Sequence, residues 1–187
     1  MAIQSRSLTY DDLQRMRETH DKRLELIDGE LFVTPSPTTI HQRVIRRLHH
    51  LLEIAVIEAG VGEFFPAPYD VKLADGSIVE PDLVAVLTER FGLIAVDRIE
   101  GVPDFIVEVV SPSSKTHDRV RKRDLYARHG VSEYWLVDPD ARNVTIFSDP
   151  QEGQFRSERV IIDTAVSATI PGLSADLKAL FAPVPGL

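Results

Sequence analysis

Acidic side chains beside apolar segments are the first sign of chemistry in this chain. Glu80 and Asp82 open the run "EPDLVAVL" (80–87), and Glu108 lies inside "DFIVEVVSPSS" (104–114). Both runs have apolar residues on both alternating faces, which is typical of a strand covered on both sides. An unpaired carboxylate is costly to bury, so acids in such places are expected to share a cation. The sequence therefore predicts a metal ion held by Asp82 and Glu108.

The spacing of these acids favours one pairing over another. Asp82 and Glu108 belong to different expected strands, and neighbouring strands lie about 4.8 Å apart, so their carboxylates can reach one ion if they share a side. Asp104 competes with Asp82 because "PD" occurs at 81–82 and again at 103–104. Four residues along one strand separate Asp104 from Glu108 by roughly 13 Å, which is too far for one magnesium ion.

Lys122 is the candidate catalytic lysine of the same site. It lies on an expected helix from about 114 to 129, one turn after Asp118 and one turn before Tyr126. The arginines of this segment fall largely on other sides, so the side of Lys122 is expected to face the sheet. Two explanations remain open: a catalytic ammonium, or a structural salt bridge to Asp118 or a sheet carboxylate, which spacing alone favours.

The expected elements form a mixed sheet flanked by helices, of the α/β or α+β class. A capping pattern at Thr9 and Asp12 predicts a helix over 10–17, and Asp28-Gly29 predicts a hairpin. Helical spacing of apolar residues predicts a long helix over 40–59. Strands are expected over 81–87, 104–110, 132–138, 143–148 and 154–162, and a short helix over 174–181. We expect one domain over 1–187, with an N-terminal helical extension (1–23), a core (24–170) and a C-terminal helix and tail (171–187).

Composition excludes several function classes. The chain has no Cys, so disulfides and thiolate metal sites are absent, and no apolar run suggests a secretory signal or membrane span. We therefore expect a cytoplasmic protein. The net charge of −8 argues against indiscriminate polyanion binding. Segments 41–52 and 111–130 are nevertheless basic, and they supply candidate phosphate contacts, although charge alone favours solvated helix faces. These candidates are His41, Arg43, Arg47 and Arg119.

At this point the sequence resembles a known family. The ordered segments "ELIDGELFVTPSP", "HQRVIRRL", "PDLV", "IVEVVSPSS" and "KRDLYARHGVSEYWLVDP" are similar to the Uma-two-like endonucleases of the PD-(D/E)xK, restriction-endonuclease-like superfamily. The resemblance covers about residues 10–170. It implies a mixed central sheet with helices around it and a divalent metal held by acids on central strands.

The resemblance also assigns roles to individual residues. Asp82 matches the acid of the "PD" half and Glu108 the acid of the second half, so both would bind Mg²⁺, for which Mn²⁺ may substitute. The superfamily's lysine normally stands two residues after the second acid, where this chain has Val110. Lys122 matches a lysine displaced onto the following helix. Glu30, after the hairpin turn, matches a further acid; as a strand residue it would otherwise be solvated.

Three functions follow as hypotheses. The first is a metal-dependent endonuclease that hydrolyses DNA phosphodiester bonds, expected to act as a homodimer because cleavage of both strands by a small single-site enzyme usually needs two copies. The second is a catalytically inactive nuclease-like module for nucleic-acid binding or assembly, favoured by Val110 and the acidic net charge. The third treats Asp82, Glu108 and Lys122 as a buried ion network, in which removal of one member destabilises the fold by several kcal/mol.

Overall fold

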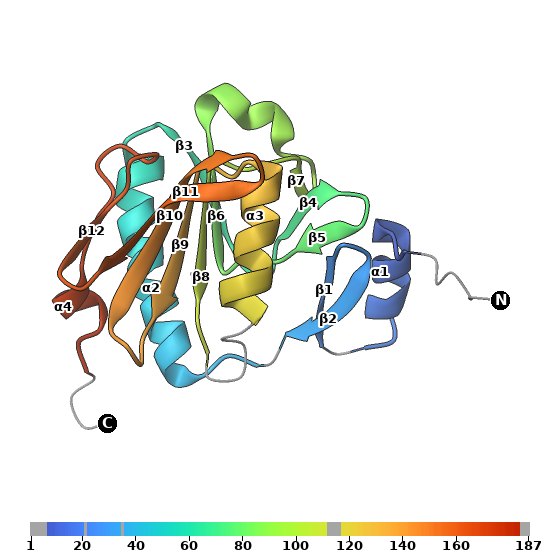
Figure 1. Cartoon of the computed structure of the whole chain (residues 1–187), viewed down its shortest axis with the longest axis horizontal. Helices are drawn as coiled ribbons and strands as arrows, with labels where there is room; N and C mark the ends of the chain where they lie inside the picture. Colours follow the sequence, from blue (N-terminus) through green and yellow to red (C-terminus); the bar gives the residue numbers. More distant parts are fainter. Residues whose placement is uncertain (1–6, 21, 35, 112–116, 184–187) are drawn as a thin grey trace.

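A six-stranded mixed sheet is the largest layer of the protein. The computed structural model describes residues 7–20, 22–34, 36–111 and 117–183. The strand order is β11-β10-β9-β8-β6-β3, with β8 and β9 parallel and the other neighbours antiparallel. The predicted class, a mixed sheet flanked by helices, is confirmed (Figure 1). The strands are β3 (Gly62–Pro66), β6 (Leu83–Leu87), β8 (Phe105–Val109), β9 (Glu133–Asp138), β10 (Asn143–Gln151) and β11 (Gln154–Ile161).

Two helices cover the opposite faces of this sheet: α2 (Thr39–Leu52) and α3 (Arg123–His129) (Figure 1). Side chains alternate along β8, as the strand period requires. Val107 and Val109 pack in the core cluster that contains residues of α2, whereas Ile106 and Val110 pack with residues of α3. Glu108 therefore faces α3, the helix that follows Lys122.

The long predicted helix is present and changes type before its end. Thr38 caps α2 by accepting a hydrogen bond from the backbone N–H of His41, and a π-helical segment, Glu53–Glu58, continues the helix. Gly60, at φ 67°, follows at the predicted end. The second predicted helix is described from His117 as a π-helical segment, His117–Lys122, which leads into α3 and ends at Gly130. Residues 112–116, with most of "SPSS", lie outside the described residues.

A smaller sheet, in the order β2-β1-β5-β4-β7, lies beside the central one (Figure 1). Asp28 and Gly29 form the predicted hairpin turn with φ values of 54° and 78°, as a two-residue turn of this kind requires. Leu13 of α1 (Tyr10–Arg17) packs with Leu24, Leu26 and Ile78, so a hydrophobic cluster spans the boundary expected at residue 23. The strands are β1 (Arg23–Ile27), β2 (Glu30–Thr34), β4 (Asp70–Ala74), β5 (Ser77–Val79) and β7 (Arg98–Glu100).

The remaining elements close the fold. A 3₁₀ segment, Thr88–Leu93, follows β6, and β12 (Thr164–Val166) pairs with β13 (Ser174–Asp176) before α4 (Leu177–Leu180). Over the described part of the chain, no helix combines the length and apolar character needed to cross a membrane.

The pairing of β3 with β6 should depend on the absence of a side chain at Gly62. A Cβ there would lie 2.5 Å from the Val86 carbonyl oxygen, so Gly62→Ala is expected to destabilise the protein by about 1–3 kcal/mol through overpacking. A Cβ at Gly92 would meet nothing within 4 Å, and Gly92→Ala is the matched control. Urea unfolding of both variants measures the difference. Equal stabilities would contradict the close β3–β6 approach.

Candidate functional site

Glu108 lies in a buried polar cluster on the α3 side of the central sheet. Lys122 donates a hydrogen bond from Nζ to Glu108 Oε1 at 2.7 Å, and the Tyr126 hydroxyl donates to the same oxygen at 2.8 Å. Lys122 is only 2% exposed. Burial, and then the negative charge of Glu108, raise the pKa of Tyr126 well above its usual value, so its hydroxyl remains a donor. The helix thus presents a cation and a hydroxyl to one carboxylate.

Glu25, on β1, is the second partner of Lys122. Its Oε1 lies 3.0 Å from Lys122 Nζ and accepts the backbone N–H of Glu80 at 2.7 Å. Burial alone would raise the pKa of Glu25, but Lys122 and this backbone hydrogen bond outweigh it and lower the pKa. The sequence analysis missed Glu25. The available signal was the one that singled out Glu108, an acid inside an apolar run, here "RLELI".

Asp82 lies just before β6, at the end of the sheet next to Glu108. Leu83 pairs with Val107, and continuing this antiparallel register by one residue sets Asp82 opposite Glu108. Asp82 Oδ2 accepts the backbone N–H of Val109 at 2.8 Å, and His41 Nε2 lies 3.0 Å from the same oxygen. Asp82 is therefore hydrogen-bonded to Val109, the residue that directly follows Glu108.

Arg23 links the acids into one unit, the carboxylate cluster, which consists of Glu25, Glu80, Asp82 and Glu108. Its Nε donates to Glu80 Oε2 at 2.9 Å, and its Nη1 lies 3.9 Å from Asp82 Oδ1. Burial opposes the charge of Arg23, but the carboxylates of Glu25, Asp82, Glu80 and Glu108 together raise its pKa. Glu80 itself has a raised pKa because burial outweighs Arg17 and Arg23.

Asp104, which the spacing argued against, and Glu30 both lie outside the carboxylate cluster. Asp104 accepts the backbone N–H of Leu87 at 2.9 Å and pairs with Arg90 at 3.0 Å, at the far end of β6 from Asp82. The structure does not bring Glu30 into the carboxylate cluster. Its side chain is 72% exposed and lies 3.4 Å from Arg121, because Glu30 directly follows the hairpin turn. From this hairpin, it is Glu25 that reaches the cluster.

The donor set fits a hard divalent cation with few protein ligands. Among the described residues, no group of three His, Asp or Glu side chains is arranged to hold a metal ion by itself. Within the same residues, Asp82 Oδ1 accepts no hydrogen bond, and its near partner is Arg23 at 3.9 Å. Mg²⁺ keeps several waters and needs only one or two carboxylates. Asp82 and Glu108 therefore suit the ion as donor types, and the strand register sets them opposite each other.

The predicted phosphate-contacting residues of α2 have other partners. His41 is buried against Asp82. Arg47 donates to the carbonyls of Leu180 and Ala182 at 2.7 and 2.9 Å, and Arg43 donates to the Ala182 carbonyl. These two arginines hold the end of α4 because α2 and the C-terminal segment cover the same side of the sheet. The side chain of Arg119 lies outside the described residues.

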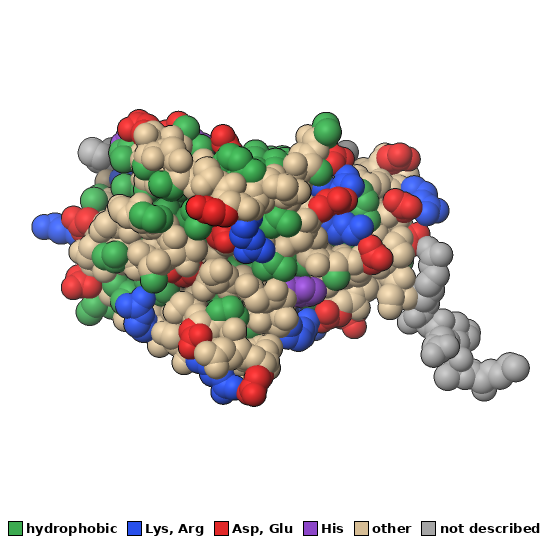
Figure 2. Space-filling view, turned by 90° about the horizontal axis from the view of Figure 1, so that it is seen from above, with side chains coloured by type: hydrophobic (Ala, Val, Ile, Leu, Met, Phe, Trp, Pro, Cys, Tyr) green, Lys and Arg blue, Asp and Glu red, His purple; other side chains and the backbone are tan. Residues whose placement is uncertain are grey.

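Basic and acidic side chains are interspersed on the face that Figure 2 shows. On the coloured part of the face in Figure 2, Lys and Arg side chains lie among Asp and Glu side chains and do not form a continuous basic patch. Arg121, next to Lys122, is 53% exposed and packs its guanidinium 4.7 Å from the centre of the Phe32 ring. Arg121 is therefore a solvent-exposed basic side chain that directly precedes Lys122, the partner of Glu108.

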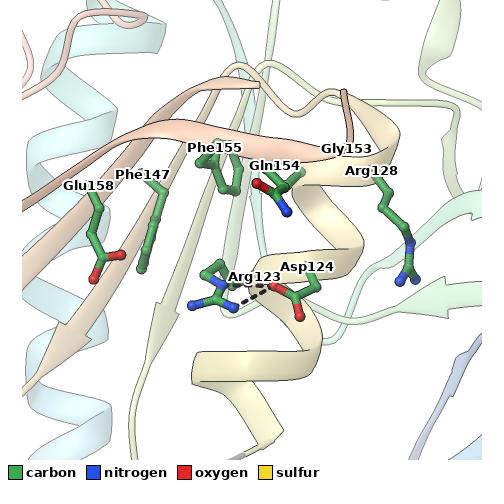
Figure 3. Close-up of a pocket in the computed structure, with 9 residues that line it drawn as sticks. Arg123, Asp124, Arg128, Phe147, Gly153, Gln154, Phe155 and Glu158 are labelled. Atoms are coloured by element: carbon green, nitrogen blue, oxygen red, sulfur yellow. Dashed lines mark hydrogen bonds and ion pairs between the residues drawn. The ribbon is translucent and has the colours of Figure 1, made fainter. Parts of the chain in front are cut away.

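A cavity of about 480 Å³ lies between α3 and β11, outside the carboxylate cluster (Figure 3). Its cations are already paired, Arg123 with Asp124 at 2.7 Å and Arg128 with Asp28 at 2.6 Å. Neither of these two arginines therefore presents an unpaired positive charge to the cavity. Its lining consists of Arg123, Asp124, Ala127, Arg128, Phe147, Gly153, Gln154, Phe155 and Glu158.

Removing the buried ammonium should be costly. Lys122→Met leaves Glu25 and Glu108 without this cation, and we expect a loss of about 3–5 kcal/mol at pH 7 by urea unfolding. The pKa of Glu25 is lowered in the folded protein, so its stabilisation is present above the ordinary pKa of 4.5 and is lost as pH falls through the lowered value. The difference from wild type should therefore shrink in acid. Lys72→Met, which breaks an exposed pair with Asp75, is the control and should change little. A similar loss in both variants would contradict the buried network.

Arg47 should contribute to stability rather than to nucleic-acid binding. Arg47→Ala removes two hydrogen bonds to carbonyl oxygens, and we expect it to cost about 1 kcal/mol. Its exposed neighbour Arg46 provides the control, Arg46→Ala. Thermal unfolding measures stability, and the salt dependence of DNA binding counts phosphate contacts. A smaller salt slope in Arg47→Ala with unchanged stability would reverse the assignment.

Comparisons with known proteins identify the family and the fold. A family model described as "Uma2: Putative restriction endonuclease" matches residues 10–178. Among solved structures, the chain is similar to "a putative nuclease belonging to DUF820" from Anabaena variabilis ATCC 29413, with a TM-score of 0.77 and 20% identity over 94% of this chain and 98% of that one. At that identity the likeness shows the fold. No curated protein matches the chain. Because the family model spans nearly all of its residues, the chain belongs to the Uma2 family.

Proposed function

We propose that this protein is a metal-dependent endonuclease that hydrolyses DNA phosphodiester bonds. The observation that carries the proposal is the convergence of Asp82 and Glu108 at one end of the central sheet, with Lys122 Nζ 2.7 Å from Glu108. The description of the family as a "Putative restriction endonuclease" supports the same reaction class.

Asp82 and Glu108 would hold Mg²⁺, or Mn²⁺ in its place, through carboxylate oxygens. When bound, the ion would make a coordinated water more acidic and offset negative charge on the phosphate in the transition state. Asp82 is fixed for this task, because one of its oxygens is held by the backbone of β8 and by His41. The other oxygen, Oδ1, is the one offered to a cation.

Lys122 would orient the attacking water or neutralise charge on the phosphate. Its ammonium is held by two carboxylates, at 2.7 and 3.0 Å, so its position is set before a substrate arrives. The Tyr126 hydroxyl fixes Glu108 from the same helix. Arg23, whose Nη1 lies 3.9 Å from Asp82 Oδ1, would carry a second positive charge toward a bound phosphate. Preorganised charges of this kind act without reorganisation during the reaction.

The alternative function is a nuclease-like module that binds nucleic acid or assembles without chemistry. It is favoured by the pairing of the cluster's acids with Lys122, Arg23 and Arg17, which satisfies buried charge without a metal ion. In that case the network serves stability alone. Metal binding separates the two functions, because only the first requires it.

Cleavage of plasmid DNA tests the proposal. With Mg²⁺ or Mn²⁺, the wild-type protein should nick supercoiled plasmid, and Asp82→Asn and Glu108→Gln should lose activity by about 100-fold or more, the scale for removal of one charge-stabilising group. Both substitutions preserve side-chain size, so the variants should fold.

Asp104→Asn is the matched control. It alters a buried acid of the second "PD" pair, at the far end of β6, and should leave cleavage unchanged once its folding is verified. Equal nicking by all four proteins would indicate a contaminating nuclease. Complete inactivity of the wild type with both metals and several DNA forms would favour the module without chemistry. We further propose a homodimer, which would supply two sites for the two strands.

A further inference from the structure

His41 occupies an unusual position for a histidine of an amphipathic helix. It lies in the first turn of α2, is buried, and has its Nε2 3.0 Å from Asp82 Oδ2. Its other ring nitrogen, Nδ1, is buried without a hydrogen-bond partner in the part of the chain that the structure describes. An apolar side chain would avoid this unpaired nitrogen, whose burial is unfavourable. The contact with Asp82 therefore explains why this buried position carries a histidine.

The chemistry of the contact makes His41 the donor of this hydrogen bond. An ionised carboxylate only accepts hydrogen bonds, so Nε2 must carry the proton that is donated to Asp82. Val109 N–H donates to the same oxygen at 2.8 Å. Two donors thus converge on Oδ2, which leaves Oδ1 as the oxygen that faces Arg23.

We propose that His41 is a positioning residue that holds Asp82 by Oδ2, so that the aspartate binds a divalent cation through Oδ1 alone. This inference rests on the proposed function, since it requires a cation at Asp82. Some residues hydrogen-bond to a metal ligand without touching the metal. Their removal commonly weakens metal binding by 10- to 100-fold. The backbone N–H of Val109 cannot do this alone, because a single hydrogen bond leaves the carboxylate free to rotate about it.

Calorimetric titration with Mn²⁺ tests the role without relying on activity. His41→Leu should weaken Mn²⁺ binding by about 10- to 100-fold. His41→Gln should restore most of the affinity, because the amide Nε2 of glutamine can reach the position of the imidazole Nε2 and donate to Oδ2. His50→Leu alters an exposed histidine of the same helix and should bind Mn²⁺ as the wild type does.

Asp82→Asn separates failure of the inference from failure of the proposed function. If Asp82→Asn abolishes Mn²⁺ binding while His41→Leu binds as tightly as wild type, the metal site stands and the role of His41 is overturned. If the wild type binds no Mn²⁺, the metal site and the role of His41 both fall. If His41→Leu and His41→Gln are equally weak, the hydrogen bond is not what matters and the inference also fails.

A measurement on the wild type covers the case in which His41→Leu does not fold. Nitrogen-15 NMR of the imidazole reports which ring nitrogens carry a proton. The proton is expected on Nε2, in slow exchange with solvent because the ring is buried. A proton found on Nδ1 with a bare Nε2 toward Asp82 would overturn the proposal.

Discussion

The structure depends on neutralising four carboxylates that are buried at one end of a hydrophobic sheet. Lys122, Arg23 and Arg17 supply the positive charge, and each contacts more than one acid. Isolated buried charges are unfavourable, and breaking a buried pair commonly costs about 3–5 kcal/mol. The elements that carry these residues are therefore held in one arrangement: β1, the segment before β6, β8 and the helix around Lys122.

The ionic network extends beyond the cluster to the N-terminal helix. Arg17 of α1 donates to both carboxylate oxygens of Asp70, at 2.7 and 2.9 Å, and it also pairs with Glu80. Leu13 of the same helix fills the core of the smaller sheet. The helix that resembled an appendage in the sequence is thus tied by both apolar and charged contacts to the segment that positions Asp82.

The presence of Val at position 110 and of the basic partner of Glu108 on the following helix has a simple structural explanation. Val110 stands two residues after Glu108, on the α3 side of β8, and packs in the core cluster with Leu125. Lys122 approaches Glu108 from the helix above that cluster. A helix-borne ammonium can reach the carboxylate that a strand lysine would otherwise serve, while the strand position remains available for packing. The departure from the usual spacing therefore does not leave Glu108 without a basic partner.

The sequence by itself determined many of the elements and two of the four acids of the carboxylate cluster. The hairpin at Asp28-Gly29, the helix capped at Thr9 and the mixed sheet follow from turn chemistry and periodicity, which are local properties. Asp82, Glu108 and Lys122 could be singled out because acids in apolar runs, and a lysine on the inner side of a helix, are costly unless paired.

Only the tertiary structure decided which residues meet. Glu25 rather than Glu30 joins the cluster, His41 turns inward to Asp82, and Arg43 and Arg47 hold the C-terminal segment. These contacts join segments 41 to 139 residues apart, or depend on which face of a strand is covered. Periodicity says that a residue is inside or outside, but the identity of its partner is set by how the sheets and helices pack.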